Sequence, residues 1–168
     1  MARPPRSRRW RPMHSIHLID AENVAGTARP TRGEFADGRS RLNAVAPAGP
    51  HDHSVVAAGG ASIFEAGLTW PTAQLLKGHG PDGADHALLE WAAAADLVTR
   101  FDALVIASGD FAFVSLAAEV RAVGLPVTVV TWRNSCSRVL AGVASTVLWL
   151  DPTTPTPVTI ALEAPRAA

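Results

Sequence analysis

Three aspartates stand where the sequence predicts the edge of a sheet. Asp20 ends the predicted strand 14–20. Asp110 comes after the apolar run 103–107, from which Ser108 and Gly109 separate it. Asp85 lies in the first turn of the helix predicted after a Gly-rich loop. Ligands of open α/β sheets bind beyond the carboxyl ends of the strands, so we expect the three carboxylates to meet there. Taken singly, Asp85 could instead cap its helix, and Asp20 and Asp110 could be turn formers.

Carboxylates that gather at one sheet edge repel each other and need a counter-charge. A hard divalent cation supplies it, and Mg²⁺ typically uses a few carboxylates while keeping several of its waters. Mg²⁺ or Mn²⁺ held in this way can orient a water for in-line attack on a phosphodiester. The residue types therefore point to metal-assisted hydrolysis.

The elements that must position these carboxylates alternate between strands and helices. Such alternation predicts an α/β fold with three α/β/α layers and a mainly parallel central sheet. Pro71 restricts one strand to the sheet edge, and Gly124 is expected to end a helix. Strands are expected over 14–20, 54–58, 70–76, 102–107, 125–131 and 146–150, and helices over 32–46, 84–100, 111–123 and 133–141. Residues 21–23 are expected to form a turn, 62–67 are ambiguous, and 77–83 form a loop.

Composition places limits on the class of protein. Apolar residues make up 48% of the 168 positions, enough for a sizeable core, and no apolar run approaches the ~20 residues of a membrane span. Residues 1–12 hold five Arg and no acid, so the rest of the chain has a net charge of −5. We expect a cytoplasmic protein with a disordered Arg/Pro-rich arm (1–13), a folded domain (14–151) and a flexible tail (152–168). The arm either contacts a phosphate backbone or only solubilises the chain.

Three short blocks contain the three aspartates. They are Leu18-Ile19-Asp20-Ala21-Glu22-Asn23-Val24, then Lys77-Gly78 leading to Gly83-Ala84-Asp85-His86-Ala87-Leu88-Leu89, then Ser108-Gly109-Asp110. In this order and spacing the blocks resemble the signatures of NYN domains, which belong to the PIN-like superfamily of metal-dependent ribonucleases. The resemblance spans roughly residues 15–151 and includes the closing stretches 124–130 and 140–150.

The resemblance implies an endoribonuclease that hydrolyses RNA with bound Mg²⁺ or Mn²⁺. It implies that Asp20, Asp85 and Asp110 are the metal carboxylates and that Asn23 is a fourth polar member that orients a ligand, water or phosphate. Many relatives carry a second acid two residues after the last aspartate, where this chain has Ala112. That departure supports an alternative, a catalytically weak or inactive RNA-binding regulatory domain of the same fold. A homodimer is left open.

Four further residues are candidates for substrate binding. Lys77 could hold a phosphate, or be a solvated residue at a strand end. Ser108 could bind a phosphate or Asp110, or be a small turn residue. Trp132 could stack a base, and Arg133 follows it at the rim of the same crevice, although packing explains Trp132 equally well.

Two other functional classes fit the sequence poorly. A haloacid-dehalogenase-like phosphatase needs a second aspartate two residues after the first, and Glu22 stands there. A dinucleotide-binding domain needs G-x-G-x-x-G after the first strand, and the chain has no such motif there.

Overall fold

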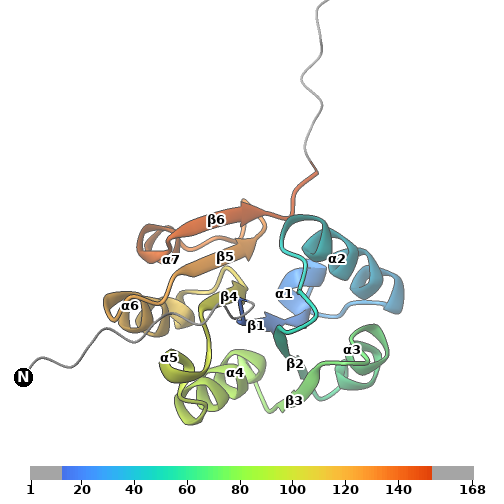
Figure 1. Cartoon of the computed structure of the whole chain (residues 1–168). Helices are drawn as coiled ribbons and strands as arrows, with labels where there is room; N and C mark the ends of the chain where they lie inside the picture. Colours follow the sequence, from blue (N-terminus) through green and yellow to red (C-terminus); the bar gives the residue numbers. More distant parts are fainter. Residues whose placement is uncertain (1–12, 153–168) are drawn as a thin grey trace, which may run out of the picture.

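The computed structural model describes residues 13–152, and Figure 1 shows a sheet enclosed between two layers of helices. The strands are β1 (Ser15–Asp20), β2 (His53–Gly59), β3 (Gln74–Gly78), β4 (Ala103–Ala107), β5 (Val127–Thr131) and β6 (Thr146–Trp149). The helices are α1 (Ala21–Ala25), α2 (Arg32–Val45), α3 (Ile63–Thr69), α4 (Gly83–Ala94), α5 (Leu97–Arg100), the 3₁₀ turn η1 (Phe111–Phe113), α6 (Val114–Ala122) and α7 (Arg138–Val143). Apart from residues 13 and 152, the predicted arm and tail lie outside the described residues.

The strands form one parallel sheet in the order β3-β2-β1-β4-β5-β6. The chain builds the half with β2 and β3 first and then crosses to the other side of β1 to build β4, β5 and β6. The strand order therefore reverses between β1 and β4, and sheets of this kind bind ligands at that point, outside the carboxyl ends of the strands. The predicted three-layer α/β/α fold is confirmed.

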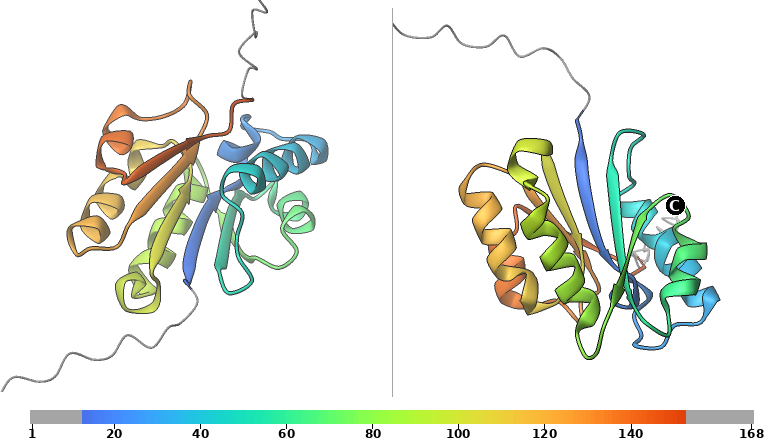
Figure 2. Two further views of the ribbon diagram at one scale, coloured as in Figure 1. Left: turned by 45° about the horizontal axis from the view of Figure 1, so that its top comes forward. Right: turned by 90° about the horizontal axis from the view of Figure 1, so that it is seen from below.

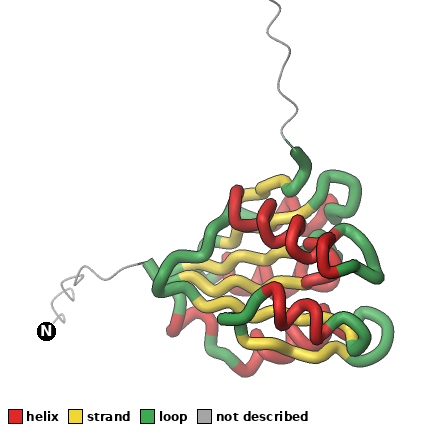
Figure 3. The backbone as a smooth tube through the Cα atoms, turned by 90° about the vertical axis from the view of Figure 1, so that its right-hand side faces the viewer, coloured by secondary structure: helices red, strands yellow, loops and turns green. Residues whose placement is uncertain are grey.

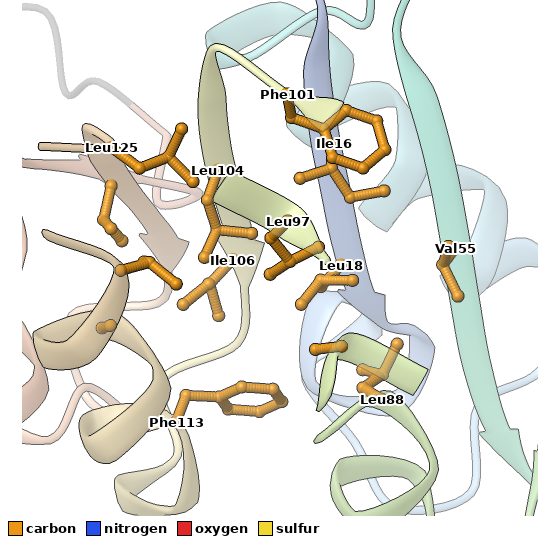
Figure 4. Close-up of a cluster of buried hydrophobic side chains, with 14 of the residues drawn as sticks. Ile16, Leu18, Val55, Leu88, Leu97, Phe101, Leu104, Ile106, Phe113 and Leu125 are labelled. Atoms are coloured by element: carbon orange, nitrogen blue, oxygen red, sulfur yellow. The ribbon is translucent and has the colours of Figure 1, made fainter. Parts of the chain in front are cut away.

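Helices cover both faces of the sheet, as Figures 2 and 3 show. Leu18 of β1 packs on one face with residues of α4, α6 and α7. Its neighbour Ile19 packs on the other face with residues of α1, α2 and α3. Figure 4 shows the first of these clusters, in which Phe113 and Leu88 lie among the strand residues. Because both faces are covered, the central strands are almost continuously apolar.

Local sequence explains where several helices begin. A capping box starts α2, because the Thr31 side chain accepts from the Glu34 backbone N–H while Glu34 accepts from that of Thr31. The Ser137 side chain caps α7, so this helix begins at Arg138 rather than at Arg133 as predicted. Within residues 13–152, no helix is long and apolar enough to cross a membrane.

Several other predicted elements also have different bounds in the structure. The helix predicted over 84–100 is broken into α4 and α5 at Asp96, whose φ of 49° is left-handed. The predicted edge strand lies at the edge, but β3 begins at Gln74, so Pro71 stays outside it. Residues 21–25 form the short helix α1 instead of a turn, and the ambiguous segment 62–67 contributes to α3.

Candidate functional site

Asp20 joins the central strand to the first helix. It is the last residue of β1, and its Oδ1 accepts a hydrogen bond of 3.1 Å from the Asn23 backbone N–H, which caps α1. The residue is 8% exposed. An N-cap carboxylate of this kind is fixed in position by the helix that it starts.

Asp85 reaches the same place through a tight turn. A Cβ atom on Gly78 would lie only 2.5 Å from the Ala84 backbone N, so the end of β3 and the start of α4 touch through their backbones. Asp82, with φ of 54°, turns the chain back between them. As a result Asp85, in the first turn of α4, is 5% exposed, and among the described residues its Oδ1 has no hydrogen-bond partner.

Asp20 and Asp85 form a buried carboxylate pair. Burial raises the pKa of Asp20 to about 8, and the neighbouring Asp85 and Glu22 add to the rise, while the Asn23 N–H opposes it. Burial also raises the pKa of Asp85 to about 6, with Asp110 and Asp82 adding to the rise and the hydrogen bond with Asp20 lowering it. Two carboxylates this close do not both ionise readily, so the metal-free pair holds a proton near neutral pH.

Asp110 lies at the mouth of the site and is exposed to solvent. Its Oδ1 accepts a 2.7 Å hydrogen bond from the Ala112 backbone N–H and so caps η1. The Asp110 backbone N–H donates to Ser108 Oγ at 3.2 Å. The charge of Asp110 reaches Asp85, whose pKa it raises. The structure therefore brings the three predicted aspartates to one edge of the sheet.

Asn23 connects two parts of this edge. Its Oδ1 accepts a hydrogen bond of 3.3 Å from the Gly109 backbone N–H, which ties α1 to the turn that carries Asp110. Gly109 has no room for a side chain, because a Cβ there would lie 2.5 Å from the Ser135 carbonyl oxygen and from Thr131 Oγ1. Asn23 thus holds the Ser108–Asp110 turn against β1.

These residues line a cavity of about 800 Å³. Its acidic lining residues are Asp20, Glu22, Asp82, Asp85, Asp110 and Asp151. Among the lining residues of the described chain there is no Lys, Arg or His. Polar uncharged residues of the lining include Asn23, Thr27, Asn134 and Ser135. Such a cavity attracts cations, and without one it repels a polyanion.

Two of the lining acids were not singled out from the sequence. Glu22 Oε1 accepts a 2.8 Å hydrogen bond from the Gly59 N–H at the end of β2. Asp151 follows β6, and its Oδ2 accepts from the Arg133 backbone N–H at 2.9 Å. Each stands just after a strand end in the chain, and this position was the available signal. Their bonds to other segments are apparent only in the folded chain.

The four candidate substrate residues lie differently from one another. Lys77 is exposed on β3 beside Gly60 and does not line the cavity. Ser108 is fully buried and holds Asp110 through its backbone N–H. Trp132 lines the cavity, but Arg133 does not, because its guanidinium lies over Trp149, 4.6 Å from the ring centroid.

Trp132 is held firmly by its neighbours. Its indole N–H donates to the carbonyl oxygens of Asn23, at 3.1 Å, and Val24, at 3.2 Å. The Arg41 guanidinium lies 5.5 Å from its ring centroid, and Gly26 packs against the ring edge. The indole N–H thus completes the backbone of α1 and is not free to bind a ligand.

The carboxylate pair suits a hard divalent cation. Within residues 13–152, no group of three or more His, Cys, Asp or Glu side chains is arranged to hold one ion. Mg²⁺, however, is commonly held by one or two carboxylates, with waters and substrate phosphates completing its shell. The unpartnered, buried Asp85 Oδ1 is a ligand atom of the required kind. Asp20 and Asp85 therefore fit a cation that keeps several of its waters.

Comparison with known proteins supports the fold and goes no further. No protein-family model and no curated protein matches the sequence. A crystal structure of a protein of unknown function from Vibrio parahaemolyticus RIMD 2210633 is similar, with a TM-score of 0.58 and 16% sequence identity. The match covers 83% of this chain and 93% of that one. At this identity the likeness concerns the fold alone.

Proposed function

We propose that this protein is a metal-dependent endoribonuclease of the NYN, PIN-like type. The observation that carries the proposal is the buried pair Asp20 and Asp85, with an unpartnered Asp85 Oδ1, at the point where the strand order reverses. Burying two neighbouring carboxyl groups costs stability, and a bound cation would offset that cost.

In this proposal each residue of the edge has a role. Asp20 and Asp85 hold a divalent cation, Mg²⁺ or Mn²⁺, which would supply Lewis-acid activation of water and charge neutralisation for phosphodiester hydrolysis. Asp110, exposed at the mouth, would accept a hydrogen bond from the attacking water. Asn23 keeps Asp110 in register with the pair through Gly109. Because only acids among the charged residues line the cavity, the cation is also what allows an RNA phosphate to approach.

A second candidate is an RNA-binding domain of the same fold without turnover. Ala112 favours it, since this position of the η1 turn contributes only a backbone N–H to Asp110. Asp110 accepts that bond and is then the only acid that this turn contributes to the site.

The test is cleavage of a mixed RNA pool with Mg²⁺ or Mn²⁺. We expect the wild type to cleave RNA, and both EDTA and Asp110→Asn to abolish cleavage. A wild type that retains RNA in a gel shift without cleaving it favours the binding domain. A wild type that neither binds nor cleaves RNA overturns both functions.

A further inference from the structure

The loop between β5 and α7 is a fixed part of the cavity wall. At its start the Arg133 backbone N–H donates to Asp151 Oδ2 at 2.9 Å. The Ser135 backbone N–H donates to the Trp132 carbonyl at 3.2 Å, and the indole N–H of Trp132 is bonded to α1. The residues on both sides of Asn134 are therefore held in place by hydrogen bonds.

The same loop is joined to the turn that carries Asp110. The Ser137 backbone N–H donates to the Gly109 carbonyl at 2.8 Å. A Cβ atom on Gly109 would lie 2.5 Å from the Ser135 carbonyl oxygen, so the two backbones touch there. Asn134 directly precedes this contact, and it lines the cavity that Asp110 also lines. The fold therefore sets the position of the Asn134 backbone relative to the Asp110 turn.

Asn134 carries an amide that the fold does not use. The residue is exposed, and its side chain forms no hydrogen bond within residues 13–152. Asn23 and Thr27 also bring donor groups without a partner in that part of the chain to the cavity lining. Asn23, however, already connects α1 to Gly109, and Thr27 follows the end of α1, where backbone carbonyls disfavour an anion. Asn134 is the donor of the three that stands apart from α1.

We propose that the Asn134 amide donates a hydrogen bond to a phosphate oxygen of the bound RNA strand. The inference rests on the proposed function and adds a substrate contact outside the carboxylate set. In the described lining the charged residues are all acids, so beyond the cation only neutral hydrogen-bond donors can hold a phosphate there. A donor on a fixed loop also loses little freedom when the strand binds.

Asn43 offers a matched control. It is also an exposed asparagine, but it belongs to α2, none of whose residues lines the cavity. Exposed asparagines are ordinary on protein surfaces and need no function. Asn43→Asp changes the net charge by the same amount as Asn134→Asp. A difference between the two sites therefore measures what the place in the cavity wall adds.

The experiment measures binding of a fluorescein-labelled, unstructured RNA by anisotropy, with Ca²⁺ in place of Mg²⁺ and a gel to show that the RNA stays intact. We expect Asn134→Ala to raise the Kd about tenfold, because a hydrogen bond to a charged group is lost. Asn134→Asp, which has nearly the same shape, should raise the Kd further because a carboxylate repels the phosphate. Asn43→Ala and Asn43→Asp should bind as the wild type does. Circular dichroism shows that each variant is folded.

A second readout locates the phosphate. In RNAs that carry one methylphosphonate linkage at successive positions, a neutral methyl group replaces a charged phosphate oxygen. At one position the replacement should weaken binding to the wild type and weaken binding to Asn134→Ala much less, since the contact is already lost there.

Three outcomes would contradict these expectations. Equal Kd values for the wild type and both Asn134 variants overturn the inference while the proposed function stands, and so do losses that are additive at every methylphosphonate position. Wild-type affinity in Asn134→Asp contradicts a phosphate contact. A wild type that does not bind RNA overturns the proposed function and this inference together.

Discussion

Replacing Asp20 by asparagine should stabilise the metal-free protein at neutral pH. The folded chain holds Asp20 protonated up to a pKa of about 8, whereas the ordinary value is 3.8. At pH 7 the unfolded chain has released this proton and the folded chain has not. Folding at pH 7 therefore requires the group to bind a proton about three pH units above its ordinary pKa. At 1.36 kcal/mol per unit, the cost is roughly 4 kcal/mol for an isolated group.

The variant should recover only part of that cost. The raised pKa values belong jointly to Asp20 and Asp85. Half or more of the free-energy cost therefore remains in the variant, because Asp85 is still buried there. Asparagine keeps an oxygen for the Asn23 N–H and has an NH₂ group to donate to Asp85. We expect Asp20→Asn to gain about 1–2 kcal/mol at pH 7.5 in EDTA, which is roughly 3–6 °C in Tm at the middle of that range.

The way in which the stability difference between variant and wild type changes with pH identifies its cause. At pH 4 the folded Asp20 is protonated and the unfolded Asp20 is close to half protonated, so the wild type carries only a small penalty and the two proteins should differ little. The penalty grows as pH rises toward 8, and the advantage of the variant should grow with it. Added Mg²⁺ should stabilise the wild type more than the variant and narrow the gap.

Thermal and urea unfolding from pH 4 to 8 checks these expectations, with Glu119→Gln as the control because Glu119 is an exposed acid on α6. A variant less stable than the wild type at pH 7.5 in EDTA would refute the reasoning. So would an advantage that does not change with pH, since it could not arise from a titrating carboxyl group.

Three further variants test the parts that position the site. Gly78→Ala should destabilise the fold by about 2 kcal/mol or more in urea unfolding, because its Cβ would lie 2.5 Å from the Ala84 N. The control Gly142→Ala in α7, which has open space around it, should change stability little or raise it by up to about 1 kcal/mol. Equal effects of the two substitutions would contradict the close approach at Gly78. Trp132→Phe should lose about 1–2 kcal/mol, because two carbonyls of α1 lose their indole donor, and an unchanged Tm would contradict this. Burial lowers the pKa of His17 although Asp52 opposes the shift, so the contribution of His17 to stability should be lost as pH drops below about 6.5. The wild type should therefore lose stability relative to His17→Gln over that range, and a stability difference that does not change with pH would contradict this.

The predictable part of the site depends on a general property of parallel sheets. Asp20 and Asp110 each come at or just after the end of a short, mostly apolar strand, and parallel strands place their last residues at one edge of the sheet. The Gly-rich segment before Asp85 indicated a turn that leads to a helix start, and the structure shows Gly78 and Gly83 in direct backbone contact there. Local patterns sufficed for these residues.

Other features depend on contacts between distant segments. Glu22 meets Gly59 of β2, and Asp151 meets Arg133, and neither pairing has a local signature. The role of Trp132 also depends on carbonyls more than a hundred residues away. The break at Asp96 was missed because the surrounding residues are good helix formers, and its left-handed φ is a property of that single position.

The central claim is that the Asp20–Asp85 pair holds the cation required for RNA cleavage. The most direct measurement is the initial rate of cleavage of an unstructured RNA against Mg²⁺ concentration, for the wild type, Asp85→Asn and the control Glu119→Gln. The account predicts a saturable rate that EDTA abolishes, a loss of about a hundredfold or more in Asp85→Asn and wild-type behaviour in Glu119→Gln. Cleavage by Asp85→Asn at the wild-type rate, or cleavage that persists in EDTA, would contradict it.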